Sequence, residues 1–401
     1  MEIERDYQTI HQGKPECRRA DARLEKAPVD TDVSLALRQI EARQLLRKKV
    51  PSWSENEELL FPAHLSIEQC SSEASAQYKA NQLTGETFAD LTGGLGVDTY
   101  YISQHFQQAN YVERQGGLCD LAKHNFEVLS ANVKVWNETA EAYLKHCAAH
   151  DCIFIDPARR DEQGRKTVSI SDCTPDVASL LELLLEKANK VMVKLSPMLD
   201  ISKALKELKH VSEVHVVAVT NECKELDVIL ERDYQDEPLF VCVNLLTPQP
   251  ELRFTMENER NCLSKLADSV LRYLYEPNPA IMKVGCYKLL TERFGVFKLH
   301  KNSNLYTSEQ LIPDFPGRIF EVEGWAPNNK KLKQTLLGDV DKASIAVRNF
   351  PLSVAELRKA WKIGDGDETY LFATTLKGEK KVVIRTKKTA SNEAVPLVFK
   401  K

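Results

Sequence analysis

The sequence predicts an α/β protein whose central domain is a doubly wound, mostly parallel sheet. From about residue 85 to 232, short runs rich in β-branched and aromatic residues alternate with stretches of helical periodicity. A glycine-rich turn, "TGGLG", follows the first run and precedes an amphipathic stretch. The last two runs are separated only by "TNECKE", which is too short for a crossover helix. The last strand is therefore expected to pair antiparallel to its neighbours.

Residues 1–84 are predicted to form a helical region. The stretch "DVSLALRQIEARQLLRKKVPSW" places leucine and isoleucine side chains near one helical face, and Pro51 is expected to end that helix. A second helix is predicted over "IEQCSSEASAQYKANQL".

Seven strands are predicted in the domain that spans residues 85–235. Their sequences are, in order, "TFADL", "NYVERQ", "VKVWN", "CIFIDP", "KVMVKLS", "EVHVVAV" and "LDVILER". Helices are expected between the first six, which makes those strands parallel. A seven-stranded sheet with one late antiparallel strand is similar to the sheet of class I, Rossmann-like methyltransferases and unlike that of dehydrogenases.

Two α+β domains are predicted after the sheet. Residues 236–320, expected to be ferredoxin-like, contain "ELRFTMENE", a helix over "LSKLADSVLRYLY" and a strand at "GVFKLH". Residues 321–401 follow a β-α-β-α-β-β pattern, from "IFEVEGWA" to "KKVVIRTKK".

The glycine turn favours S-adenosylmethionine (SAM) over a dinucleotide. A G-x-G-x-x-G fingerprint that starts at Gly94 needs glycine where Thr99 stands, so pyrophosphate binding is disfavoured. SAM has no phosphate and needs an acidic residue ahead of a short glycine turn. A tight strand-to-helix turn without any ligand is the alternative interpretation. The predicted cofactor contacts in the turn are Asp90, Thr92, Gly93, Gly94 and Gly96.

The motifs also carry a family resemblance. "DLTGGLGVD" is similar to the first motif of small-subunit rRNA guanine-N2 methyltransferases and, more loosely, of cap trimethylguanosine synthases. The wider set of "EQCSSEASAQYKA", "DLTGGLGVD", "DPARR", "VKLSPMLD" and "ECKEL" resembles a bacterial family of class I SAM-dependent methyltransferases with a THUMP-like C-terminal domain. The resemblance implies a fold and a cofactor but no particular substrate.

Four further residues are predicted to contact the cofactor. Glu113 ends the second strand, where a carboxylate can accept hydrogen bonds from both ribose hydroxyls. Glu138 and Thr139 follow the third strand, at the place where this fold usually meets the adenine. Asp98 begins the helix after the turn, where it either caps that helix or holds the methionine amino group.

"IFIDPARR" is predicted to carry the chemistry, because the loop after the fourth strand faces the methyl group in this fold. "DPAR" resembles the D-P-P-[YF] and N-P-P-Y signatures of amino-methyltransferases. The resemblance implies that Asp156 and the Pro157 carbonyl accept hydrogen bonds from an exocyclic amine, so that alignment supplies much of the rate. Arg159 stands where the signature has an aromatic residue, and a guanidinium can also stack on a base. Arg159 and Arg160 are alternatively phosphate contacts or surface ion pairs.

Lys194, in "VMVKLSP", supports a second chemistry. RNA ribose 2′-O-methyltransferases resemble this layout when Lys194, Asp156, Glu225 and Lys79 converge, because a hydroxyl needs help with deprotonation. A structural ion pair between Lys194 and Asp156 is the alternative. An oxidoreductase and a non-catalytic RNA-binding protein remain as functions of other classes.

Charge distribution indicates the partner. The whole chain has a formal net charge of −4, whereas residues 330–401 hold 16 lysines and arginines against 8 acidic residues. This basic end predicts an RNA-facing surface, with rRNA or tRNA as substrate. The 10 cysteines show no disulfide or zinc spacing, so no metal site is predicted. With no long apolar run, the sequence predicts a cytoplasmic protein without a membrane span and does not indicate its oligomeric state.

Overall fold

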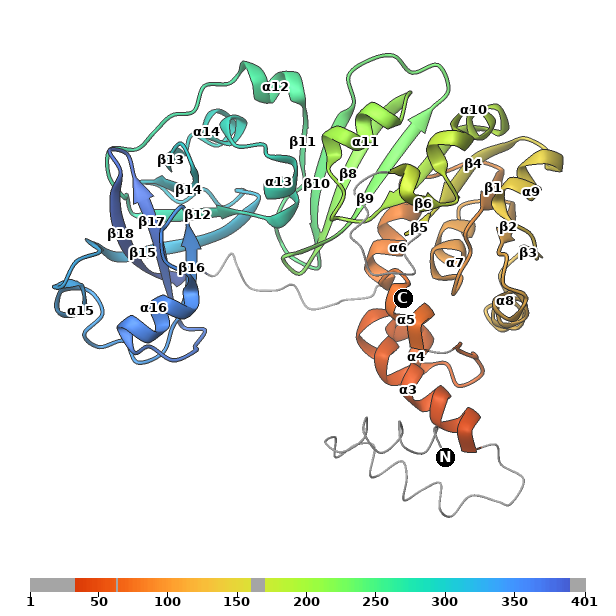
Figure 1. Ribbon diagram of the computed structural model, residues 1–401, viewed down its shortest axis with the longest axis horizontal. Coiled ribbons are helices and arrows are strands. Elements are labelled where there is room, and N and C mark those ends of the chain that lie inside the picture. Colours follow the sequence, from red (N-terminus) through yellow and green to blue (C-terminus); the bar gives the residue numbers. More distant parts are fainter. Residues whose placement is uncertain (1–32, 63, 160–169, 390–401) are drawn as a thin grey trace. The chain divides into compact units, whose positions relative to one another are not determined.

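The computed structural model describes residues 33–62, 64–159 and 170–389 (Figure 1). The chain divides into two compact units, Met1–His146 and Cys147–Lys401.

Helices precede the strands of the first unit. They are α3 Val33–Lys49, α4 Pro51–Glu55, α5 His64–Gln69 and α6 Glu73–Ala80. The single helix expected over "IEQCSSEASAQYKANQL" is in fact two. It breaks because Ser72 is an N-cap, and its side chain accepts a hydrogen bond from the Ser75 backbone N–H at 3.2 Å.

Three parallel strands of the first unit match the first three predicted ones. They are β1 Thr87–Asp90, β2 Gln108–Val112 and β3 Val133–Trp136, with β2 in the middle. Helix α7 Val97–Ser103 follows β1, α8 Gly116–Val128 follows β2, and α9 Ala140–His146 follows β3. The predicted strand, glycine turn and helix around residue 94 are confirmed.

In the second unit, one sheet contains the other four predicted strands and two more. The spatial order is β11-β10-β8-β9-β7-β4. Strand β9 is antiparallel to both β7 and β8, as predicted. Strands β10 and β11 continue the sheet beyond residue 235, where the predicted domain ended. The bounds are β4 His150–Ile155, β7 Ala188–Leu195, β8 Val211–Val219, β9 Glu222–Glu231, β10 Leu239–Leu245 and β11 Leu252–Thr255, with helices α10 Val177–Lys187 and α11 Ile201–Glu207.

A small hairpin follows β4, at the sequence "DPAR". Its strands are β5 Ala158–Arg159 and β6 Cys173–Thr174, and the 3₁₀ turn Ile170–Asp172 precedes β6. The Ile170 backbone N–H donates to a Glu207 carboxylate oxygen at 3.0 Å, which ties the returning arm of the hairpin to the end of α11.

A second sheet occupies the C-terminal part of this unit (Figure 1). Its order is β13-β14-β12-β15-β18-β17-β16. Strand β15 crosses the expected domain boundary at residue 320 and pairs with β12 on one side and β18 on the other, so residues 273–388 share one sheet. The bounds are β12 Tyr273–Pro277, β13 Phe297–His300, β14 Ser303–Ser308, β15 Gly317–Pro327, β16 Ser344–Arg348, β17 Thr369–Leu376 and β18 Lys380–Lys388.

Five short helices accompany this sheet in the described part of the chain. They are α12 Met256–Asn261, α13 Pro279–Val284, α14 Lys288–Arg293, α15 Leu332–Thr335 and α16 Val354–Trp361. The β-α-β-α-β-β pattern from β15 to β18 is confirmed. The helix predicted over residues 263–275 is wrong, because Ala267 and Lys265 instead exchange backbone hydrogen bonds with Lys298 of β13. Its apolar residues Ala267, Val270 and Leu274 enter the core from a non-helical stretch that leads into β12.

Helix α13 packs against β8, β9 and β10, so the two sheets of the second unit are in contact. Lys283 of α13 donates from Nζ to the Leu199 carbonyl at 2.7 Å. Leu199 lies in the loop after β7. The C-terminal module, residues 273–388, therefore contacts the segment that leaves the carboxyl end of that strand.

Candidate cofactor and acceptor sites

Each of the three glycines in the turn after β1 has a different environment. A Cβ on Gly93 would lie 2.1 Å from the Tyr111 ring, so that position has no room for a side chain. Gly96 has a φ of +87° and faces Phe126. Gly94 has a φ of +53°, yet a Cβ there would meet only the Thr92 carbonyl, at 3.8 Å. Gly94 therefore borders open space, where a ligand can approach the backbone.

Asp90 shapes this turn from inside the protein. Its side chain is fully buried, one oxygen accepts from the Thr92 backbone N–H at 2.9 Å, and the other accepts from the Thr99 hydroxyl at 2.6 Å. These bonds hold the chain as it leaves β1. A fully buried carboxylate supports a cofactor site by positioning the turn, not by touching the ligand.

Glu113 joins the end of β2 to the same turn. One carboxylate oxygen accepts from the Gly94 backbone N–H at 3.1 Å and the other from the Gln115 N–H at 2.9 Å. The Tyr111 hydroxyl donates to the Gly94 carbonyl at 2.7 Å, and burial raises the pKa of Tyr111 so that it remains a donor. Each carboxylate oxygen can accept a second hydrogen bond, which leaves Glu113 capacity for ribose hydroxyls.

Asp98 belongs to a cluster with two residues of the N-terminal region. Lys79 Nζ lies 3.1 Å from Asp98 Oδ1, and the Ser71 hydroxyl donates to Asp98 Oδ2 at 2.6 Å. Lys79 is fully buried, so it cannot reach a substrate hydroxyl. Its predicted place among the ribose-methylating residues is therefore wrong. Ser71 was missed, although it lies in the quoted "EQCSSEASAQYKA" motif.

The two residues predicted near the adenine have local partners. The Thr139 hydroxyl accepts from the Ala142 backbone N–H at 3.2 Å, as a cap of α9. Glu138 Oε2 lies 2.7 Å from His146 Nε2. Trp136, at the end of β3, packs its ring against His146 with the centroids 5.9 Å apart.

Asp156 and Lys194 meet at the carboxyl ends of two adjacent parallel strands. Strand β4 pairs with β7, Asp156 directly follows β4, and Lys194 is the penultimate residue of β7. Lys194 Nζ lies 2.6 Å from Asp156 Oδ2. The lysine side chain is 11% exposed and the aspartate 37%, so the carboxylate is the more accessible partner.

The acidic residue of β9 that stands beside this pair is Asp227, whereas Glu225 was predicted. Lys194 stands opposite Asp227 of β9, which in turn stands opposite His215 of β8. Asp227 is fully buried and was missed in the sequence. Glu225 is also buried, but its register partner on β8 is Val217. Period-two alternation placed both acids on one face, yet the register that selects Asp227 depends on strand pairing.

The structure describes one of the two predicted arginines. Arg159 lies in β5, where its backbone pairs with Cys173. Arg160 lies outside the described residues.

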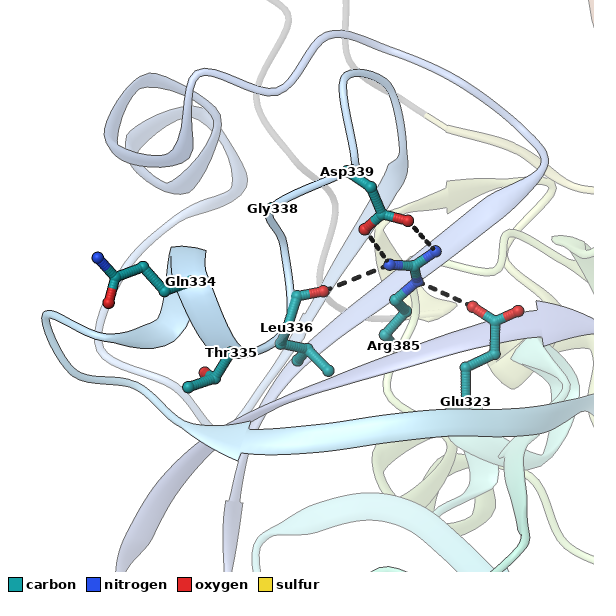
Figure 2. A pocket seen from close by; sticks show the side chains of 7 residues that line it. All are labelled: Glu323, Gln334, Thr335, Leu336, Gly338, Asp339 and Arg385. Carbon is teal, nitrogen blue, oxygen red and sulfur yellow. Dashed lines mark hydrogen bonds and ion pairs between the residues drawn. The ribbon is translucent and has the colours of Figure 1, made fainter.

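Several arginines of the basic C-terminal module form ion pairs with carboxylates of the same module. Figure 2 shows a polar hollow of about 370 Å³ in which Arg385 reaches Asp339, Glu323 and the Leu336 carbonyl. Arg385 Nη1 lies 2.6 Å from Asp339 Oδ1, and this bond lowers the pKa of the Asp339 carboxyl. Arg318 and Arg348 both pair with the buried Glu276. These arginines stabilise the module and are poorly placed to bind phosphates.

The described part of the chain has neither a membrane-spanning helix nor a metal-binding cluster. Over residues 33–62, 64–159 and 170–389, no helix is both long and apolar enough to cross a membrane. The same ranges hold no cluster of three or more histidine, cysteine, aspartate or glutamate side chains suited to a metal ion.

Comparison with known proteins identifies the family. A ferredoxin-like domain model matches residues 273–316, and a THUMP domain-like model matches residues 317–388. The crystal structure of a "putative methyltransferase" from Porphyromonas gingivalis W83 is 35% identical, covers 96% of this chain and 97% of its own, and superposes with a TM-score of 0.83. The chain belongs to this methyltransferase family. Comparison with curated protein sequences gives no match.

More distant structures match parts of the chain. An rRNA methylase from Streptococcus thermophilus is 13% identical over 43% of this chain and 99% of its own, with a TM-score of 0.30. TrmK from M. capricolum, in complex with S-adenosylhomocysteine, is 10% identical over 40% of this chain and 69% of its own, with a TM-score of 0.32. At these identities and scores the likenesses say nothing about the activity of this chain.

Family membership confirms the predicted class I fold and the enzyme class, a SAM-dependent methyltransferase. The glycine turn fits that cofactor. Gly94 leaves open the space that a Cβ would fill, and the nearby Glu113 carboxylate suits a ribose. Thr92, Gly93 and Gly96 hold the backbone of the same turn.

Proposed function

We propose that this methyltransferase modifies an exocyclic base amine, with guanine N2 favoured, in structured RNA of the ribosomal or transfer class. The observation that carries the proposal is the Asp156 carboxylate at the end of β4, more than a third exposed and held by Lys194 at 2.6 Å. A carboxylate that is both fixed and accessible suits an acceptor that must be aimed.

The chemistry that the chain's own residues perform is orientation. Asp156 accepts a hydrogen bond from one amine N–H, and the Pro157 carbonyl accepts from the other. SAM supplies an electrophilic methyl group, so the N–C bond forms as the S–C bond breaks. The methylated amine then releases its extra proton to Asp156 or to water. No strong base is required, because an aligned lone pair gains most of its advantage from position.

Lys194 supports this role by fixing Asp156. A salt bridge between two partly exposed side chains contributes little to stability, about 1 kcal/mol or less. Its value here is geometric, because it holds the carboxylate in one orientation. Arg159 and Arg160 are proposed to contact the base or a phosphate next to it.

RNA is the proposed partner because exposed lysines remain on the C-terminal module after its arginines are paired. Lys380 Nζ lies 4.8 Å from the centroid of the Trp325 ring, and Lys388 Nζ lies 5.0 Å from that of Tyr370. The exposed lysines suit backbone phosphates, and the partly exposed Trp325 ring suits an unstacked base, whereas Tyr370 is buried. A substrate of this kind belongs in the cytoplasm.

The contact between α13 and β8–β10 supports a shared task for the C-terminal module and the acceptor residues. Lys283 holds the Leu199 carbonyl in the loop that begins two residues after Lys194. RNA held by the module would thus be positioned against the end of β7. Asp156 and Lys194, the acceptor pair, lie there.

Ribose 2′-O-methylation is a second candidate, and the same ion pair favours it. A lysine 2.6 Å from an aspartate can assist deprotonation of a hydroxyl. Glu225 is buried and stands opposite Val217, whereas Asp227 stands opposite Lys194, so the acid that completes the predicted set would change.

Nucleoside mass spectrometry tests the proposal. We expect rRNA or tRNA from a strain that lacks the gene to have lost one N2-methylguanosine, which wild-type protein restores and an Asp156→Ala variant does not. Loss of a 2′-O-methylated nucleoside would favour the second candidate. An unchanged set of modified nucleosides in both RNA classes would contradict the proposal.

A further inference from the structure

The loop after β7 carries an exposed apolar side chain at the edge of the sheet where the acceptor pair lies. This loop ends the "VKLSPMLD" motif, and Met198 lies four residues after Lys194. Met198 is 64% exposed. Asp156 follows the neighbouring parallel strand β4, whose carboxyl end is at the same edge. Ligands of open α/β sheets bind outside the carboxyl ends of the strands, so Met198 is on the side that a substrate approaches.

The loop that carries Met198 is tied at several atoms. The Leu199 backbone N–H donates to the Ser196 carbonyl at 3.1 Å, and the Met198 N–H donates to Ser196 Oγ at 3.3 Å. Lys283 Nζ donates to the Leu199 carbonyl at 2.7 Å, and the Leu199 side chain is buried. Asp200 then serves as the N-cap of α11. The neighbours of Met198 thus hold its backbone in place while its own side chain remains exposed.

Met198 lies close enough to the acceptor pair to contact a base held there. Four residues of extended chain span at most about 14 Å, and the turn that Ser196 and Leu199 close makes the path from Lys194 shorter. Lys194 is itself in contact with Asp156, at 2.6 Å. A base whose amine is bound by Asp156 can therefore place one face against the Met198 side chain.

A base in this site needs contacts on its faces as well as on its edge. The Asp156 carboxylate and the Pro157 carbonyl are proposed to contact the edge, through the amine. Enzymes that act on a base take it out of the stack and hold its faces between aromatic or apolar side chains. A thioether is flexible and polarizable, and it makes favourable contacts with aromatic rings. Met198 supplies such a group at the place where a face has to be covered.

We infer that Met198 contacts one face of the acceptor base, and that this base is unstacked when it is methylated. Met198 is then a specificity-determining residue, because its contribution to binding requires a flat ring at the acceptor position. The inference rests on the proposed function, which takes a base as the methyl acceptor. It adds that the substrate presents this base outside a helix.

The test compares two RNAs that differ only in the acceptor base. One is a short rRNA or tRNA fragment that contains the nucleotide methylated by the wild type, and the other has an abasic ribose at that position. Fluorescence anisotropy on the full chain with S-adenosylhomocysteine should show that Met198→Ala weakens binding of the intact fragment by about three- to tenfold. Binding of the abasic fragment should change by less than about twofold. Met198→Leu should restore most of the affinity for the intact fragment.

Leu263→Ala is the matched control, because Leu263 is an apolar residue of the same unit that is 81% exposed, in the loop after α12. It should bind both fragments as the wild type does. Equal weakening for both fragments in Met198→Ala would overturn the inference, as would unchanged binding of the intact fragment.

The position of the methyl group tests the proposed function separately. A methyl group on the ribose would overturn that function, and the two fragments would still decide whether Met198 contacts the base. If the wild type methylated neither RNA class, the proposed function and the inference would both fail.

Discussion

The glycine turn of the first unit and the acceptor pair of the second unit are organised by different kinds of contact. At the turn, Asp90 and Glu113 are both at least nine-tenths buried, and each accepts a backbone N–H of the turn or of its own loop. At the acceptor pair, Asp156 is held by a side-chain ammonium and is 37% exposed. One region fixes a backbone, and the other aims a side chain.

This difference predicts how each region responds to a substitution. A backbone held by several buried acceptors has little freedom to adjust, so a change within it should abolish ligand binding. A single aimed carboxylate can be removed without disturbing the chain around it, so its loss should appear in the rate of methyl transfer. Affinity and rate should therefore separate between the two regions.

The largest effect is expected for Gly94→Val. The φ of +53° is unfavourable for a β-branched residue, and the added atoms would fill the open space beside the turn. We expect affinity for S-adenosylhomocysteine to fall by about 100-fold or more, measured by calorimetry, with a native circular dichroism spectrum. Gly117→Ala is the control, because a Cβ there meets nothing within 4 Å. Unchanged affinity in folded Gly94→Val would remove this turn from the cofactor site.

Asp156→Ala should reverse that pattern. The variant keeps the turn intact and removes the acceptor of the amine N–H, so S-adenosylhomocysteine affinity should stay within about twofold. The single-turnover rate should fall by about 100-fold, the usual order for loss of alignment at a reacting atom. A parallel loss of affinity and rate would show that the two regions do not divide the work as described.

Lys194→Met sharpens the choice between the two chemistries. If Lys194 only orients Asp156, the rate should fall by about tenfold at most and remain independent of pH from about 6 to 10, because the amine nucleophile needs no prior deprotonation. If the acceptor is a ribose hydroxyl, loss of the base should cost about 10² to 10⁴ in rate. The wild-type rate should then rise with pH until the base is deprotonated.

The smallest effect is expected for substitutions on the C-terminal module. They should weaken RNA binding and leave the affinity for SAM unchanged. Lys380→Glu with Lys388→Glu should weaken RNA binding several-fold and reduce the slope of log K against log salt by about 0.7 to 0.9 for each phosphate that these lysines neutralise. Lys123→Glu, at an exposed position of α8, applies the same charge change per substituted residue elsewhere. Equal salt slopes in all three proteins would mean that Lys380 and Lys388 do not face the RNA.

Much of the fold was accessible from sequence, because its signals are local. Period-two runs predicted the seven strands of the methyltransferase domain, and the length of "TNECKE" predicted the antiparallel direction of β9. The glycine turn carried its own signal in residues 90–98. The pairing of Asp156 with Lys194 followed from their places at two strand ends, which a parallel sheet brings together.

The missed features depend on tertiary contacts that no local pattern records. The segment 263–275 has apolar spacing that suits a helix, but its backbone hydrogen bonds go to Lys298 of β13 and no helix forms there. Asp227 is selected by strand register, and Ser71 by the approach of α6 to α7. The excess of basic residues in the C-terminal module can be counted in the sequence. Only the fold shows that Arg385 and Arg318 form ion pairs with carboxylates of the same module.

Delivery of the methyl group to a base amine aimed by Asp156 is the step on which the proposed function depends. Its most direct measurement is a single turnover of the full chain with methyl-labelled SAM and RNA from a strain that lacks the gene, followed by cleavage of the glycosidic bonds and mass spectrometry. We predict that the label remains with guanine, and that Asp156→Ala gives about 100-fold less of it at equal time. Label on the ribose, or equal labelling by Asp156→Ala, would contradict this step.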